Sequence, residues 1–298
     1  MSKGQEIRAF GALAGGVVAI AWSAIFVRWT GMPGVASAFY RMTIAAVVLW
    51  PALLLSGIKW MRVPVSAIWL AILSGVFFAG DVGLFNTAVL HTSAGSATFL
   101  ANNAPLLVGL LTWAITRKLP SGRFWTALAI ALAGAWLIVS VDASHLRSEL
   151  SADMLAVMSS VCFALYLVST ERLRKDFDTC ALVTLSATGS AVSLLVFAGL
   201  EHVSLAVPNG RSLAAVLGLG LICQVTGYFC LTYALGHLPA TVTSVVMLAV
   251  APLTATFAFV LFGERLTVLQ ILGGGLVVLG VWIVSRVQEN PRLSMPSE

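Results

Sequence analysis

The sequence predicts an all-α polytopic membrane protein with ten transmembrane helices, arranged as two inverted five-helix repeats. Three observations support this prediction. Hydrophobic residues make up 59% of the chain and charged residues only 10%, with a mean hydropathy of +0.97, which is more apolar surface than a soluble domain needs. Apolar runs long enough to cross a bilayer recur along the chain, and features of the first half return in the second.

Ten apolar runs are separated by short loops. About 20 apolar residues are needed to cross the hydrocarbon core of a bilayer. The first run follows a short polar N-terminus and is too long for a signal-peptide core, so we interpret it as the first span. No soluble domain is inserted between the runs, whose approximate bounds are 8–29, 34–58, 64–90, 93–116, 123–141, 152–171, 179–200, 212–236, 239–262 and 266–285.

Spans 3 to 5 align with spans 8 to 10. Pro105 matches Pro252, 147 residues further on, and Arg117-Lys118-Leu119 matches Glu264-Arg265-Leu266. Trp136 matches Trp282 after a slip of one residue. Because each unit holds an odd number of spans, the second unit must enter the membrane in the opposite orientation. The sequence therefore predicts two repeats, residues 1–147 and 148–298.

The distribution of Lys and Arg predicts the orientation in the membrane. Twelve of these residues fall on the side that holds both chain ends, and four fall on the other side, namely Arg28, Arg147, Arg211 and Arg265. Both termini are therefore expected in the cytoplasm. The net charge of +5 is spread over loops, so it indicates topology and not nucleic-acid binding. The four cysteines show no CxxC pair and no metal spacing.

Two spans carry a proline near their middle. Pro105 lies in span 4, two residues after Asn103 and three after Asn102, and Pro252 lies at the matching place in span 9. Proline interrupts helical hydrogen bonding, and freed backbone at membrane depth is tolerated only inside protein or beside a wet cavity. Paired breaks of this kind predict a transporter's central site, with Pro105 and Pro252 as hinges.

Asp81 is the single residue among twelve acids that lies well inside a predicted span. A charged Asp at mid-helix costs about 3 kcal/mol on insertion scales, so it usually faces the bundle interior. It could bind a substrate ammonium or a proton, or it could tie span 3 to a neighbouring helix. Helical geometry places Phe77 and Phe85 on the same stripe, with Asn86 just beside it.

The matching stripe of span 8 holds Gln224 and Tyr228. Trp22 lies in span 1, too deep for an interfacial belt, and could equally be plain packing. If these stripes face inward, rings and a few polar groups line a substrate cavity. The alternative is ordinary interhelical hydrogen bonding. Span 6 adds three residues at spacings of four and three, Ser159, Phe163 and Tyr166.

Arg41 is the only basic residue well inside a run, about a turn and a half from the outer end of span 2. It either snorkels to the interface or pairs with a carboxylate, and we favour a structural role. The small residues of spans 5 and 10 allow close backbone approach, so these spans are expected to be packing elements. They include Ala127, Ala131 and Ala135 in span 5 and Gly273, Gly274, Gly275 and Gly280 in span 10.

Several motifs together resemble the EamA family of the drug/metabolite transporter superfamily. They are Ala21-Trp22-Ser23-Ala24-Ile25-Phe26-Val27, Phe39-Tyr40-Arg41-Met42, Ala251-Pro252-Leu253 and Gly263-Glu264-Arg265-Leu266. The resemblance covers nearly the whole chain and is greatest to amino-acid exporters of the YddG type. It implies 5+5 inverted helices, a central cavity, export of small metabolites and a bacterial cytoplasmic membrane.

Two departures from the family pattern limit what the resemblance implies. Arg117 stands where the first repeat would carry the acid of the Gly-Glu-Arg-Leu block. Span 1 holds no acid, so the proton/drug exchange site of the small multidrug branch does not carry over.

The predicted function is a secondary transporter that exports small metabolites, most of all amino acids including aromatic ones. A multidrug or organic-cation exporter is the alternative. A membrane-embedded enzyme is disfavoured, because Asp81 has no second acid, Ser/His pair or metal cluster beside it. An interior with an acid, two Asn and rings suits a zwitterionic, neutral or cationic substrate better than a phosphate. No cofactor, metal or nucleic acid is expected, the lipid bilayer is the surrounding partner, and a monomer is compatible with the pattern.

Overall fold

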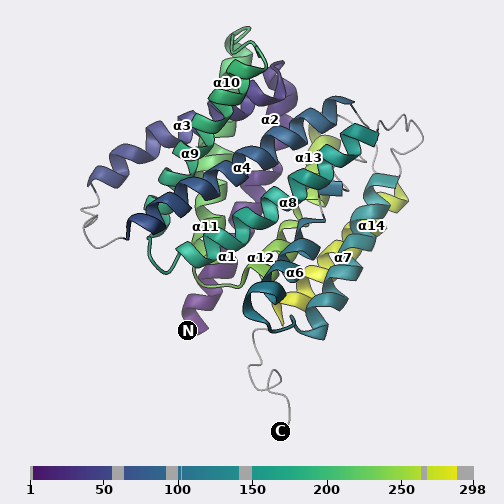
Figure 1. The fold of residues 1–298 in the computed structure, drawn as a ribbon. Coiled ribbons are helices and arrows are strands. Elements are labelled where there is room, and N and C mark those ends of the chain that lie inside the picture. Colours follow the sequence, from purple (N-terminus) through teal and green to yellow (C-terminus); the bar gives the residue numbers. More distant parts are fainter. Residues whose placement is uncertain are drawn as a thin grey trace.

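The computed structural model describes residues 3–55, 64–91, 100–101, 103–140, 150–262 and 267–286. These residues form a bundle of helices without a strand (Figure 1). Eight helical stretches are long and apolar enough to cross a membrane, and two shorter apolar helices, Ala104–Thr116 and Gly122–Ile138, complete the set. The predicted class, an all-α polytopic membrane protein, is confirmed.

The first half contributes five predicted spans, in chain order. Span 1 is divided at Trp22 into two helices, α6 covers the part of span 4 that follows Asn103, and spans 2, 3 and 5 are single helices within the described residues. Their bounds are α1 Lys3–Ala21, α2 Ser23–Thr30, α3 Gly34–Leu55, α4 Val65–His91, α6 Ala104–Thr116 and α7 Gly122–Ser140.

The second half follows the same order with more interruptions. Span 8 contains a π-helix, η3, between two α-helices, and span 9 is divided before Pro252. The bounds are α8 Leu150–Leu173, α9 Thr179–Leu200, α10 Gly210–Gly218, η3 Leu219–Tyr228, α11 Phe229–Leu235, α12 Ala240–Met247, α13 Val250–Phe262 and α14 Val268–Ser285.

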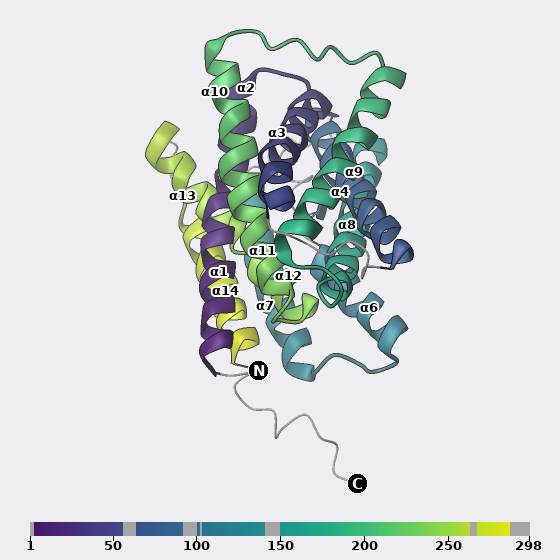
Figure 2. The same cartoon turned by 90° about the vertical axis from the view of Figure 1, so that its left-hand side faces the viewer.

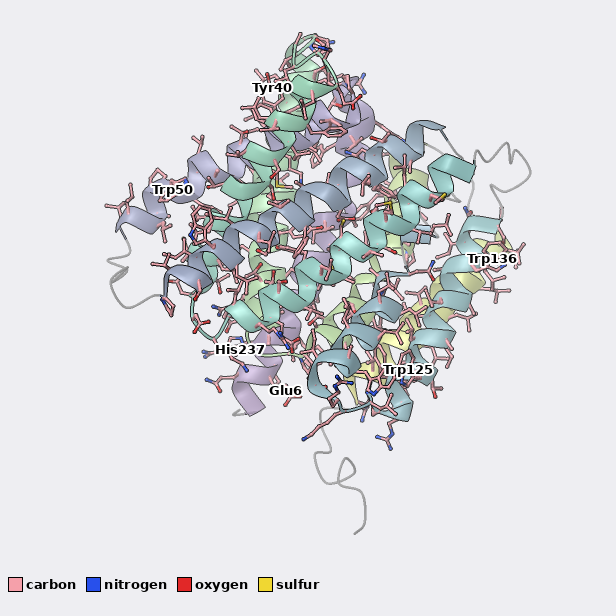
Figure 3. All side chains as sticks on the ribbon, in the orientation of Figure 1. Glu6, Tyr40, Trp50, Trp125, Trp136 and His237 are labelled. Atoms are coloured by element: carbon pink, nitrogen blue, oxygen red, sulfur yellow. The ribbon has the colours of Figure 1, made fainter. Side chains whose placement is uncertain are left out.

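The helices form two groups. Figure 2 shows α4, α8 and α9 on one side of the bundle and α1, α13 and α14 on the other, with α11 between them. In both views the start of α1 lies at the same end of the bundle as the end of α14. Figure 3 places Tyr40 near one end of the bundle, and Glu6 and His237 near the other.

Glycines allow two helix pairs to meet at backbone distance. A Cβ on Gly134 would lie 2.4 Å from the carbonyl oxygen of Gly273, and one on Gly280 would lie 2.7 Å from that of Ala127. These contacts join α7 to α14, as the small residues of spans 5 and 10 predict. Gly75 joins α4 to α9 in the same way, since its carbonyl accepts a 2.7 Å hydrogen bond from Ser190 Oγ.

The two prolines lie at helix starts. Pro105 occupies the first turn of α6, and α13 begins two residues before Pro252, after α12 has ended at Met247. A proline in a first turn removes an N–H that has no helical partner there. Both spans are therefore interrupted as predicted, with the break just before each ring. Asn102 lies outside the described residues.

The exterior of the bundle is apolar. Trp69, Val260 and Val268 are 67%, 71% and 72% exposed. In water such a surface would be unfavourable, but it suits a helix bundle in lipid, because lipid tails are as apolar as these side chains. Many polar side chains are instead buried inside the bundle, among them Arg41, Ser159, Ser190, Gln224 and Thr243.

Candidate functional site

Seven side chains from four helices form what we call the central cluster. It joins α3 and α4 of the first half to α8 and η3 of the second. Its members are Arg41, Phe78, Asp81, Ser159, Tyr166, Gln224 and Tyr228. Polar and charged groups at this depth are costly, so a cluster of them is a candidate site by position alone.

Arg41 connects three elements. It is only 5% exposed, so it does not snorkel to the membrane surface. Its Nε donates a 2.9 Å hydrogen bond to Gln224 Oε1, and its Nη1 donates a 3.2 Å bond to Ser23 Oγ. The guanidinium carbon lies 5.1 Å from the ring centroid of Tyr228 and 6.0 Å from that of Phe78. This places the cation within reach of both ring faces.

Asp81 lies three residues after Phe78 on α4. Its Oδ1 accepts a 2.7 Å hydrogen bond from Ser159 Oγ on α8. The carboxylate is close enough to Arg41 for the two charges to interact. Within the part of the chain that the structure describes, however, no carboxylate forms a direct ion pair with Arg41. The cluster therefore holds one acid and one base that are near each other but have separate polar partners.

Aromatic rings fill the space between these polar groups. The Phe78 centroid lies 4.6 Å from that of Tyr166, with nearly parallel planes, and 4.6 Å from that of Tyr228. Phe163 extends the stack, 6.2 Å from Tyr166. Offset and tilted pairs at these separations are favourable. Since Phe78, Tyr166 and Tyr228 are buried, they form the apolar wall of the cluster.

Gln224 and Tyr228 both project from the π-helix η3. Ten residues adopt the i→i+5 pattern here, and Thr226 Oγ1 also donates to the carbonyl of Leu221, five residues earlier. π-helical turns are rare and often lie at functional sites. The local backbone thus departs from α-geometry where Gln224 and Tyr228 enter the cluster.

Other predicted site residues lie outside the central cluster. Trp22 stands at the break between α1 and α2, with its ring centroid 4.8 Å from that of Phe257 on α13. Phe77 is partly buried against the main core. Phe85 packs instead with Ala88 and Ala156 in a small separate cluster.

The two predicted asparagines that the structure describes make backbone contacts. Asn86 Nδ2 donates a 3.0 Å bond to the carbonyl of Gly34, which ties α4 to the start of α3. Asn103 Nδ2 donates a 3.2 Å bond to the carbonyl of Leu100, at the broken start of α6. Both side chains therefore help to hold helix ends.

Sequence reasoning missed two members of the central cluster. Phe78 was passed over because the stripe was counted in steps of four from Asp81, although a residue three positions away shares the same face. Arg41 was given a structural role because a long cation near a helix end can reach water. The available signal was the absence of an acid near it on its own span.

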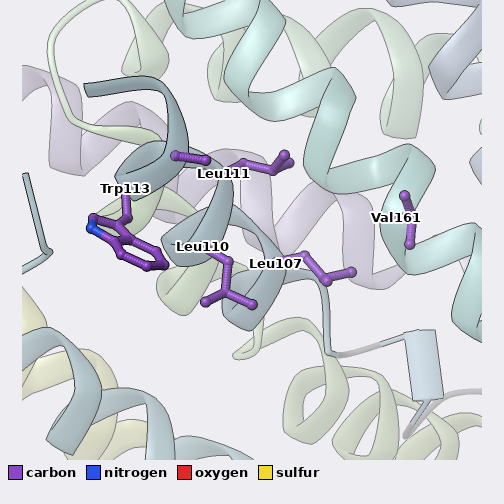
Figure 4. Close-up of a pocket in the computed structure, with 6 residues that line it drawn as sticks. Leu107, Leu110, Leu111, Trp113 and Val161 are labelled. Atoms are coloured by element: carbon purple, nitrogen blue, oxygen red, sulfur yellow. The ribbon is translucent and has the colours of Figure 1, made fainter. Parts of the chain in front are cut away.

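A separate apolar cavity of about 310 Å³ lies between α6 and α8 (Figure 4). Leu110 and Trp113 are 42% and 46% exposed, so the cavity opens on the outer face of the bundle. It shares no residue with the central cluster and offers no polar group to a substrate. Its lining residues are Leu107, Leu110, Leu111, Trp113, Ala114 and Val161.

No group of three His, Cys, Asp or Glu side chains that could hold a metal ion occurs in the described ranges. The central cluster can instead bind by charge, hydrogen bonding and ring contact. A cation could approach Asp81, an anion could approach Arg41, and an apolar or aromatic group could lie against the stack of rings.

Comparison with known proteins adds independent information. The profile of the EamA-like transporter family matches residues 9–140 and again 150–286. The chain is 32% identical to the uncharacterized transporter YwfM of Bacillus subtilis, over 72% of this chain and 73% of YwfM. It is 26% identical to the threonine/homoserine exporter RhtA of Escherichia coli, over 68% of this chain and 66% of RhtA.

A solved crystal structure shares the fold. It superposes with a TM-score of 0.81 and covers 99% of this chain and 100% of its own, at 17% sequence identity. At that identity the likeness concerns the arrangement of helices and not the substrate. The ten-span bundle is therefore an architecture already observed by experiment.

Proposed function

Because this chain belongs to the EamA-like transporter family, we propose that it exports amino acids, aromatic ones among them, across a bacterial cytoplasmic membrane. It is a multi-pass membrane protein of a transporter family. The proposed mechanism is alternating access, in which the two halves move against each other around a substrate held between them. The proposed orientation places both termini in the cytoplasm.

The observation that carries the proposal is the composition of the central cluster. Asp81 offers a carboxylate that, among the described residues, accepts a hydrogen bond from the hydroxyl of Ser159, so it is suited to an ammonium group. The rings of Phe78, Tyr166 and Tyr228 lie beside it and suit an apolar or aromatic side chain. Since α4, α8 and η3 come from both halves, relative motion of the halves would open and close this cluster.

The interrupted spans support the same mechanism. α6 begins at Ala104, and α13 begins at Val250 after the end of α12, so spans 4 and 9 can bend at corresponding places. Pro105 and Pro252 are the proposed hinges. Trp22 packs against Phe257, seven residues after the start of α13, which links span 1 to the second half of span 9.

An exporter of drugs or organic cations is a second candidate. The specific observation in its favour is the same pairing of one acid with a stack of rings, which would accept an aromatic cation without a carboxylate. The two candidates differ in what they require at Arg41, because a cation gains nothing from a neighbouring guanidinium.

Counterflow in proteoliposomes with a panel of amino acids, organic cations and sugar phosphates would test the proposal. Asp81→Asn should weaken transport of amino acids, because a hydrogen bond to a charged group contributes about 1.5 to 3 kcal/mol, which corresponds to roughly 10- to 150-fold in affinity. Asp176→Asn is the matched control, since Asp176 is an exposed acid outside the spans.

Two results would contradict the proposal. Unchanged amino-acid transport by Asp81→Asn would remove Asp81 from the site. Transport of phosphorylated compounds alone would refute the argument from charge.

A further inference from the structure

The guanidinium of Arg41 has hydrogen-bonding capacity that the protein leaves unused. Arg carries five N–H donors. Nε and Nη1 each donate one bond, to Gln224 and Ser23, and both partners are uncharged. Nη2 is buried and finds no acceptor among the described residues. The residue as a whole is only 5% exposed, so it is 95% buried.

A buried cation of this kind is expensive. Charges removed from water are normally paired with an opposite charge and have their remaining donors satisfied. The faces of Phe78 and Tyr228 stabilise Arg41 only in part. Asp81 is close enough to interact but is bonded to Ser159. The arrangement thus lacks an anion in direct contact with the guanidinium.

We propose that Arg41 is the anchor for the carboxylate of the transported molecule. The free Nη2 and the adjacent Nη1 form one edge of the planar guanidinium, which matches the two oxygens of a carboxylate. Gln224 and Ser23 hold this plane from η3 and α2, so the edge is oriented before the substrate arrives. This inference rests on the proposed function, because it assigns the second charged end of the same substrate.

Together the two charged residues define the substrate class. Arg41 holds a carboxylate and Asp81 holds an ammonium, and the rings of Phe78 and Tyr228 lie beside the Arg41 guanidinium. α-Amino acids carry both groups on one carbon, whereas organic cations carry one. The substrate also neutralises the pair, so the central cluster gains an anion for Arg41 and a cation for Asp81 in a single binding event.

A purely structural role for Arg41 makes a different prediction. In that case Arg41 only ties α3 to η3 and α2. Its loss would weaken the binding of every ligand to the same extent, because the protein would misfold or pack more loosely. Ligands that differ only in the carboxylate separate the two roles. We therefore choose L-phenylalanine, phenethylamine, which lacks the carboxylate, and 3-phenylpropionate, which lacks the ammonium. L-threonine, 1-aminopropan-2-ol and 3-hydroxybutyrate form a second series of the same design.

The experiment measures ligand-induced thermal stabilisation and counterflow for the wild type, Arg41→Gln, Arg41→Lys and Arg211→Gln. Arg211 is the control, because it is an exposed arginine at the start of α10 that also lies over a ring, that of Trp29. Arg41→Gln should weaken binding of the amino acid and of the acid at least tenfold. Binding of the amine should change less than twofold. Arg41→Lys keeps the charge without the fork and should recover part of the loss. Arg211→Gln should resemble the wild type.

Equal losses for all three ligands of a series, or no loss for the amino acid, would overturn the proposal. If Arg41→Gln does not assemble, the wild type decides: an amine or L-phenylalaninamide that binds as tightly as the amino acid refutes the anchor, and binding at least tenfold weaker supports it. Failure of the proposed function looks different. In that case 3-phenylpropionate still raises the thermal stability of the wild type, and Arg41→Gln removes this effect, although no amino acid is transported.

Discussion

Replacing Gly273 with alanine would place one methyl group where the backbones of α14 and α7 meet. The added Cβ would lie 2.5 Å from the carbonyl oxygen of Gly134, 2.9 Å from Ile138 Cγ1 and 3.0 Å from Ile138 N. Non-bonded heavy atoms prefer about 3.5 to 4.0 Å. Two of the three neighbours are main-chain atoms that cannot rotate away, so the helices must separate. Overpacking of this kind costs about 1 to 3 kcal/mol.

Gly275 provides a matched control on the same helix. A Cβ there would meet no atom within 4 Å. Both substitutions exchange glycine for alanine inside α14, so the gain in helix propensity, about 1 kcal/mol, is common to both and cancels. Gly273→Ala should therefore be about 1 to 3 kcal/mol less stable than Gly275→Ala. Unfolding by increasing SDS in mixed micelles, followed by circular dichroism, measures this difference.

Equal stability of the two variants would refute the reasoning. It would mean that α7 and α14 do not approach at Gly273, or that the interface adapts without loss. A loss at Gly275→Ala as large as that at Gly273→Ala would also contradict it, because nothing in the described structure lies near Gly275.

Two further predictions concern a hinge and a helix tie. Pro252→Ala removes a helix-breaking penalty of about 3 kcal/mol and should favour a continuous span 9, so counterflow should slow while ligand binding is retained; Pro51→Ala, at an exposed proline inside α3, should leave counterflow unchanged. Asn86→Ala removes the bond to the Gly34 carbonyl and should lower stability by about 1 kcal/mol without changing the preference among amino acids. A changed preference would place Asn86 in the site.

The spans were predictable because bilayer thickness sets the length of an uncharged run. Gly236 to Pro239 separates α11 from α12, at the boundary predicted between the runs 212–236 and 239–262. Ser159, Tyr166, Gln224 and Asp81 were predicted on inward stripes and do lie in one cluster, because i, i+3 and i+4 spacing fixes a helix face. Their role in transport remains a prediction.

The environment of Arg41 could not be predicted in the same way. Its partner Gln224 is 183 residues away, and local spacing says nothing about such a contact. Whether a long cation snorkels depends on which groups neighbouring helices offer it. The π-helix was equally hidden, because hydropathy does not distinguish i→i+5 from i→i+4 bonding. Phe85 is the converse case, since it shares the stripe of Asp81 but packs with Ala88 and Ala156, and Trp22 packs against Phe257 outside the central cluster.

The π-helix η3 also changes what the internal repeat means. Asp81 lies in the regular α-helix α4, whereas its counterpart Tyr228, reached by counting along the chain, lies at the end of η3. Equal counting does not give equal rotation about the two axes, so the pseudo-symmetry relates chain positions without relating side-chain directions. In the proposed alternating-access cycle, exchanging the conformations of the two halves therefore does not give a state that is related to the first by exact two-fold symmetry. The conformations facing the two sides of the bilayer must then differ in free energy even before a substrate binds.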